Sequence, residues 1–359
     1  MTATENIERV ACTSRADLER IALDERPVIV RDLFTGQPIA ELTSADETVA
    51  RLGALRLLIR PEYSYNHFQA YRLDPLASTT EMTLAEYMAF ARRHMDTPML
   101  CLEQPTPEAV SSLLSLGDLA EINAGDGDRI ASRLFLGNAG NKSNLHYDRD
   151  YHATLLHQVF GRKRVILISP RESQKLRPTM NFSEYLLCNF SPEDKAAFLR
   201  YTNGYDAILQ PGETLLIPAA FWHHVEYVDD AMSVSFKLRR NRQLALLGGG
   251  LFHSNYFVQG LATRFQHAAI ATDHARFFDD LLAHYLDPAL GPREKFEAID
   301  ALFRASYAIL CADFPQARYF SSMIGTTELD LWRPRLDDGS LYGDPGALSS
   351  GAAGGARSR

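Results

Sequence analysis

The chain has 359 residues, 46% of them hydrophobic, and a formal net charge of −8 at pH 7. This length and composition allow one large domain with an appended segment. The acidic balance argues against a general nucleic-acid-binding surface, which would show a basic face. No apolar run is longer than a strand, and the N-terminus does not resemble a signal peptide, so we expect no membrane span and a cytoplasmic location. The four cysteines are scattered without a C-x-x-C pair, which favours reduced thiols.

The N-terminal part of the chain is expected to combine short strands with peripheral helices. The pattern predicts a helix near residues 14–23 and strands over 27–31 and 55–60. Thr83 followed three residues later by Glu86 has the form of a capping box, which predicts a helix that runs to about His94. These short strands and helices are expected to lie at the periphery of a β-rich core.

The middle of the chain reads as strands around an insert. Residues 154–159 and 163–168 are strand-like and flank Gly161-Arg162, which predicts a β-hairpin. An insert over 171–203 follows, in which Ser191-Pro192 predicts the start of a short helix. A further strand is predicted over 213–217, because this run is apolar and β-branched.

Beyond residue 240 the sequence becomes helical in its periodicity. We expect residues 1–240 to form the main domain, 241–336 a C-terminal helical region, and 337–359, rich in Gly, Ser and Ala, a disordered tail. Apolar residues recur at helical spacing between 292 and 310. This apolar face either covers the main domain or forms a homodimer interface.

Two histidines and one aspartate form the most informative pattern of the chain. His146 and Asp148 lie two residues apart, so on an extended segment their side chains project the same way. His223 follows the last predicted strand, 223 − 146 = 77 residues further along. Two imidazoles and one carboxylate are the ligand set that holds a non-heme ferrous ion and leaves its opposite side open. His224 is adjacent, but only one of the two neighbouring histidines can face inward.

Around these residues the sequence resembles the JmjC-like cupin oxygenases that use Fe(II) and 2-oxoglutarate, a family that includes the asparaginyl hydroxylase that inhibits hypoxia-inducible factor. The resemblance spans roughly residues 27–239. It implies a mainly β fold with peripheral helices, the double-stranded β-helix or jelly-roll cupin. The matching stretches are Pro27-Val28-Ile29-Val30-Arg31, His146-Tyr147-Asp148, Gln158-Val159-Phe160-Gly161-Arg162-Lys163, and Gly212-Glu213-Thr214-Leu215-Leu216-Ile217-Pro218 leading into Trp222-His223.

The resemblance implies roles for individual residues. His146, Asp148 and His223 match the iron ligands, and His223 is preferred over His224 because family members place the ligand directly after an aromatic pair. Lys163 matches the lysine that pairs with the distal carboxylate of 2-oxoglutarate. The positions that offer hydroxyl or amide groups to the same cosubstrate are matched by Ser143, Thr154 and Ser235.

The chain also departs from that family pattern. Two additional residues separate Asp148 from Lys163, Cys101 falls where a tyrosine is expected to contact the cosubstrate, and Ser235 replaces an asparagine. Replacing tyrosine by Cys101 removes a hydroxyl donor, so either another residue contacts the carboxylate or the cosubstrate site is rearranged. The metal site is therefore better specified than the cosubstrate site.

The resemblance implies a dioxygenase that uses molecular oxygen to hydroxylate a C–H bond, with succinate and CO2 as coproducts. The substrate, whether a peptide, a protein side chain, a modified nucleoside or a small metabolite, depends on loops around the site. Candidate contacts are Tyr63, Tyr65, His67 and Phe68, with Arg149 and Asp150. Two alternatives stay open. One is a cupin isomerase or hydrolase that uses zinc or another divalent metal without oxygen chemistry. The other is a non-catalytic scaffold protein.

Overall fold

The computed structural model describes residues 7–12, 26–60, 80–94, 100–116 without 102, 132–148, 152–240 without 180, 181 and 184, and 311–321, with isolated positions 17, 287, 289, 290, 294 and 323. Several expected features lie outside these residues. They are most of the helix at 14–23, the aromatic residues of 63–68, Arg149 and Asp150, most of the C-terminal helical region with its apolar face, and the tail at 337–359.

The chain divides into two compact units. The first comprises Met1–Asn144, Asp150–Leu167 and Tyr205–Asn241, and the second comprises Leu145–Arg149, Ile168–Gly204 and Arg242–Arg359.

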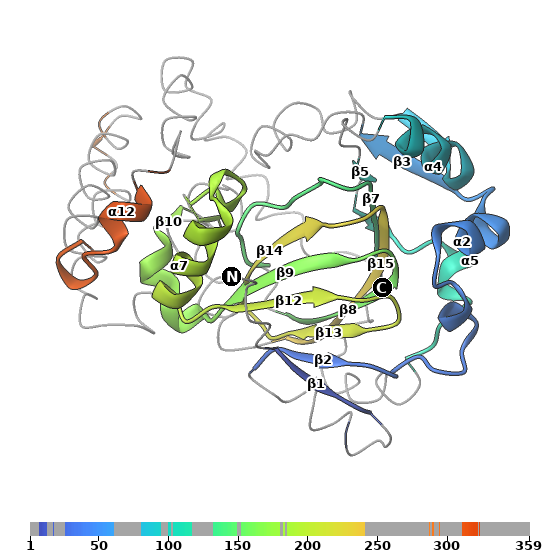
Figure 1. Cartoon of the computed structure of the whole chain (residues 1–359), viewed down its shortest axis with the longest axis horizontal. Helices are drawn as coiled ribbons and strands as arrows, with labels where there is room; N and C mark the ends of the chain where they lie inside the picture. Colours follow the sequence, from blue (N-terminus) through green and yellow to red (C-terminus); the bar gives the residue numbers. More distant parts are fainter. Residues whose placement is uncertain are drawn as a thin grey trace. The chain divides into compact units, whose positions relative to one another are not determined.

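The first unit is built on a large and a small β-sheet. The large sheet has the strand order β1 (Glu8–Val10), β2 (Val28–Val30), β13 (Thr214–Ile217), β8 (His152–Phe160), β15 (Ala231–Arg240), β7 (Ser132–Gly137), β5 (Leu100–Cys101), β3 (Arg56–Arg60) and β4 (Thr80–Thr83), with β6 (Gln104–Pro105) paired to β7. The small sheet has the order β12 (Tyr205–Leu209), β9 (Lys163–Ile168) and β14 (Trp222–Tyr227). Figure 1 shows β9 between its two neighbours.

The two sheets face each other across a buried apolar cluster. Leu156 of β8 and Leu215 of β13 pack there with Val165 of β9 and Leu209 of β12. Leu155, on the opposite face of β8, belongs to a second cluster together with residues of the N-terminal helices. The chain crosses from β8 of the large sheet to β9 of the small sheet, stays there through β12, returns to β13, and crosses again to β14 and back to β15. These strands form the predicted mainly β fold of the double-stranded β-helix type.

The predicted hairpin over 154–168 is wrong. Both strands exist, but β8 pairs with β13 and β15 in the large sheet, whereas β9 pairs with β12 and β14 in the small sheet. Gly161 has φ of +69°, and a Cβ there would lie 2.0 Å from the carbonyl oxygen of Asp230. The glycine therefore forms a tight corner between sheets, and a corner has the same local sequence pattern as a hairpin turn.

Short helices decorate the first unit, as the N-terminal sequence predicts. Helix α4 (Leu84–Arg93) has the capping box of Thr83 and Glu86 and ends at His94. Helix α2 (Ala45–Leu52) has a second capping box, which Ser44 and Glu47 form. The smaller helices are η1 (Pro38–Glu41) and α5 (Glu108–Ser111). No helix of the described residues is long and apolar enough to cross a membrane.

The second unit contains the insert and part of the C-terminal region. Its described elements are η3 (Pro170–Leu176), β10 (Pro178–Thr179), β11 (Phe182–Ser183), η4 (Leu187–Asn189), α7 (Pro192–Tyr201) and α12 (Ala317–Ser321). Helix α7 begins after the predicted Ser191 cap, whose hydroxyl accepts from the amide of Asp194. Aromatic rings of Tyr185, Phe198 and Phe320 pack edge to face, so α12 shares a core with the insert.

Candidate metal centre

His146, Asp148 and His223 lie together in the structure. One ligand atom from each residue falls within 4.8 Å of the others, which a single ion can bridge. Nε2 of His146 lies 4.0 Å from Oδ1 of Asp148, too far for a direct hydrogen bond. Their side chains are 18% and 34% exposed, so this part of the site is open to solvent. A metal with three protein ligands and an accessible remaining side can bind small molecules.

Backbone pairing near β14 positions the segment that leads to His146. The amide of Ser143 donates to the carbonyl of Val225 at 2.8 Å, and the amide of Val225 donates to the hydroxyl of Ser143 at 2.8 Å. The amide of Tyr227 donates to the carbonyl of Asn141, also at 2.8 Å. Ser143 precedes His146 by three residues and Val225 follows His223 by two, so these bonds hold the chain close to the third candidate ligand.

His223 is oriented by a hydrogen bond of its own. Its Nδ1 lies 3.0 Å from the carbonyl oxygen of Phe221, and His223 is only 9% exposed. A carbonyl oxygen only accepts, so Nδ1 is the donor in this contact, and Nε2 is the nitrogen that would bind a metal. A backbone carbonyl in this position is a common support for a metal-binding histidine.

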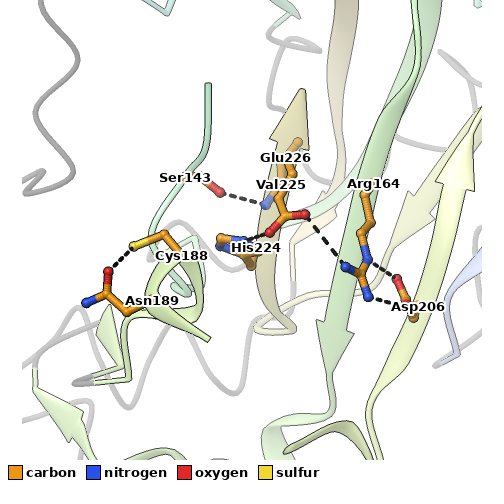
Figure 2. Close-up of polar contacts among 8 residues, drawn as sticks. All are labelled: Ser143, Arg164, Cys188, Asn189, Asp206, His224, Val225 and Glu226. Carbon is orange, nitrogen blue, oxygen red and sulfur yellow. Dashed lines mark hydrogen bonds and ion pairs between the residues drawn. The ribbon is translucent and has the colours of Figure 1, made fainter. Parts of the chain in front are cut away.

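His224 points to the opposite face of β14. Its Nε2 lies 3.1 Å from Oε1 of Glu226, and Oε2 of Glu226 lies 3.7 Å from Nη1 of Arg164 (Figure 2). Val225, between the two, packs against the cluster between the sheets. The alternation along β14 therefore places His223 on the inner face and His224 on the outer face.

Lys163 is buried on the inner face of the small sheet. Its Nζ donates to the hydroxyl of Ser233 at 2.5 Å and lies 4.2 Å from the ring centroid of Tyr227. The Ser233 hydroxyl in turn donates to Oε1 of Gln158 at 2.7 Å. Burial lowers the pKa of Lys163 from 10.5 to about 7, because the charged form loses its hydration. Among the described residues no carboxylate pairs with this ammonium.

The hydroxyl residues expected at the cosubstrate site lie on different parts of the first unit. The hydroxyl of Thr154 accepts from Nζ of Lys237 at 3.1 Å. Ser235 is buried beside Leu156 in the β8–β15 register, whereas the Ser143 hydroxyl holds β14. Cys101 pairs with Ile59 through the backbone of β5.

Sequence reasoning missed the polar residues that surround Lys163. Ser233 and Gln158 are 0% exposed and form its only hydrogen-bonded chain among the described residues. Ser233 lies two residues before Ser235 on β15, so the period of a strand places both on one face. That spacing could have identified Ser233 as a neighbour of the site.

The donor set fits a ferrous ion. Two imidazoles and one carboxylate suit a divalent transition metal, and the contact of His223 Nδ1 with a carbonyl oxygen assigns Nε2 as the metal-binding nitrogen. The triad is therefore consistent with Fe(II) binding.

Comparisons with known proteins point to one domain family. The model of the cupin-like domain matches residues 14–238. Jumonji C domain-containing protein 5 of Drosophila melanogaster is 36% identical over 111 residues, which are 29% of this chain and 26% of that protein. Lysine-specific demethylase 8 of Xenopus tropicalis is 34% identical over 116 residues, 30% of this chain and 25% of that protein. The tRNA wybutosine-synthesizing protein 4 of Aspergillus oryzae is 25% identical over 247 residues, 64% of this chain and 23% of that protein.

The matches span about a quarter of the length of these relatives. The family match covers 238 − 14 + 1 = 225 of the 359 residues, more than half of the chain. This chain therefore belongs to the cupin-like domain family, and its distant relatives include JmjC-domain proteins.

Proposed function

We propose that this chain is an Fe(II)- and 2-oxoglutarate-dependent dioxygenase that hydroxylates a C–H bond of a peptide, a protein side chain or a small metabolite. The observation that carries the proposal is the environment of Lys163. Its ammonium is fully buried, donates to one hydroxyl and has no carboxylate partner among the described residues. A buried charge without a counter-charge is unfavourable, so the anionic end of a small molecule would stabilise it.

The spacing along β14 supports a ligand with two polar ends. Tyr227 contacts the ammonium of Lys163, and His223 lies four residues earlier on the same strand. Residues four apart on a strand face the same side, so His223 and the ring of Tyr227 both lie on the inner face. A molecule that reaches both needs a metal-chelating group at one end and a carboxylate at the other, which is the chemistry of 2-oxoglutarate.

The residues of this chain would divide the work as follows. His146, Asp148 and His223 would hold the ferrous ion, which together with 2-oxoglutarate and oxygen supplies the oxidation of the substrate C–H bond and yields succinate and CO2. Lys163 would bind and orient the distal carboxylate by charge and hydrogen bonding. The rings of Tyr227 and Phe135 would exclude water from that ion pair.

The direct test is anaerobic addition of 2-oxoglutarate to the purified Fe(II) protein. A chelated keto acid gives a weak visible metal-to-ligand band, which we expect in the wild type and in His224→Ala. His223→Ala should lose the band, because it removes a ligand on the inner face, while His224→Ala is the matched control from the outer face. A wild type that retains iron but forms no band would refute the cosubstrate assignment.

The second candidate is a cupin isomerase or hydrolase that uses the same triad without oxygen chemistry. The departure at Cys101 favours it, because a family hydroxyl donor is missing there. Succinate release during turnover distinguishes the dioxygenase from this alternative. The scaffold reading predicts that His146→Ala leaves cellular function intact while removal of the C-terminal region abolishes it.

A further inference from the structure

A connected chain of polar side chains lies on the outer face of the small sheet (Figure 2). We call it the outer-face chain, and it consists of His224 and Glu226 of β14, Arg164 of β9 and Asp206 of β12. Arg164 donates to both carboxylate oxygens of Asp206, at 2.9 and 2.8 Å. Glu226 connects this pair to His224, with Oε2 3.7 Å from Arg164 and Oε1 3.1 Å from His224. All three strands of the small sheet are thus joined.

Two members of this chain directly follow residues of the candidate site. His224 follows His223 on β14, and Arg164 follows Lys163 on β9. Side chains alternate along a strand, so each pair lies back to back across the small sheet. Contacts that fix the position of Arg164 relative to His224 on the outer face therefore also fix the position of Lys163 relative to His223 on the inner face.

The outer-face chain is buried enough to define a geometry. The side chains of Arg164, Glu226 and Asp206 are 18%, 16% and 6% exposed. Hydrogen bonding to Asp206 raises the pKa of Arg164, so the guanidinium stays charged. A shielded, bidentate arginine–carboxylate pair has a narrow range of geometries, unlike a solvated surface pair.

An exposed ion pair near the ends of the same two strands provides a comparison. Arg162, just before β9, donates to Asp229, just after β14, at 2.6 and 3.0 Å. These side chains are 49% and 40% exposed. Solvent screens such a pair, and both residues lie outside the paired strands β9 and β14.

We propose that Glu226 and Arg164 are positioning residues that fix the offset between β9 and β14, and with it the separation of Lys163 from the metal ligand His223. The inference rests on the proposed function, because that separation matters only for a ligand that contacts both ends. A keto acid with a second carboxylate must satisfy both ends at once, whereas one without it contacts the metal alone. Glu226 and Arg164 should therefore affect the two kinds of ligand differently.

The test compares 2-oxoglutarate with pyruvate, a keto acid that lacks the distal carboxylate. Both are titrated anaerobically into Fe(II)-loaded wild type, Glu226→Gln and Asp229→Asn, and the visible band gives each Kd. We expect the preference of the wild type for 2-oxoglutarate over pyruvate to fall about tenfold in Glu226→Gln, as misplacement of a ligand-orienting group typically does. Pyruvate affinity should stay within about threefold, and Asp229→Asn should match the wild type.

A general loss of structure would weaken both keto acids, so the split between them identifies positioning. If Glu226→Gln does not fold, Arg164→Lys replaces it, because lysine keeps the charge but loses the two-pronged contact with Asp206. An unchanged preference in the folded variant overturns the inference and leaves the proposed function standing. A wild type that binds neither keto acid overturns the proposed function and the inference together.

Discussion

Replacing Lys163 by methionine should stabilise the ligand-free protein. The pKa of Lys163 falls from 10.5 to about 7 on burial, so at pH 7 the unfolded chain holds the proton more firmly than the folded chain. This difference between the folded and unfolded pKa of Lys163 lowers the free energy of unfolding by about 4 kcal/mol at pH 7 and by about 2 kcal/mol at pH 9. Methionine has a similar length and no charge, so Lys163→Met removes this contribution.

The gain will be smaller than this upper value, because methionine also loses the hydrogen bond to Ser233 and the ring contact with Tyr227. We expect Lys163→Met to be more stable than the wild type by on the order of 1–4 kcal/mol at pH 7, the range found when buried charges are replaced by apolar groups. The same variant should lose 2-oxoglutarate binding, so stability and function change in opposite directions.

The assay is denaturant unfolding of metal-free wild type and Lys163→Met at pH 7, 8 and 9. Because the folded pKa is lowered, Lys163 is neutral in both the folded and the unfolded chain above its unfolded pKa, and it costs no stability there. The cost appears as the pH falls below that value and grows towards pH 7. The difference between the two proteins should therefore shrink by about 2 kcal/mol from pH 7 to pH 9. A difference that stays constant across this range would refute the claim that an uncompensated buried ammonium causes it.

Three further predictions concern acid stability, a corner of the fold and the metal. Burial lowers the pKa of His157 from 6.5 to about 4, so the free energy of unfolding of the wild type should fall by about 3 kcal/mol as the pH drops from 6.5 to 4. His157→Leu should therefore unfold at a lower pH than the wild type in an acid titration, and an unchanged midpoint would contradict this. Gly161→Ala should destabilise by about 2–4 kcal/mol in denaturant unfolding, since its Cβ would meet Asp230; Gly140→Ala, at a positive φ but in open space, is the control. Fe(II) at 100 times its Kd should stabilise the folded wild type by about 2.7 kcal/mol, while His146→Ala should gain far less in anaerobic thermal unfolding.

The sequence predicted those parts of the site that follow from local spacing. His146 and Asp148 share a face because they are two residues apart, and strand alternation allows only one of His223 and His224 to face inward. The choice of His223 came from the resemblance to the oxygenase family. Capping boxes are likewise local, so the start of α4 was predictable from Thr83.

Features that depend on strand pairing across long sequence distances could not be predicted. The pattern around Gly161 suits a hairpin turn and a corner equally well, and the choice depends on partners such as β12 and β13, which lie 40 or more residues away. The outer-face chain was missed for the same reason. Arg164 and Asp206 look like ordinary surface charges until β9 and β12 are known to be neighbours.

The two adjacent histidines give β14 two alternative registers, each with an imidazole towards the metal. A shift of one residue exchanges the faces of a strand, so His224 would replace His223 on the inner side. The same shift would bring Glu226 into the apolar cluster where Val225 packs, and burying that carboxylate is unfavourable. The choice of metal ligand therefore depends less on the two histidines than on Val225, two residues after His223, and Glu226, two residues after His224.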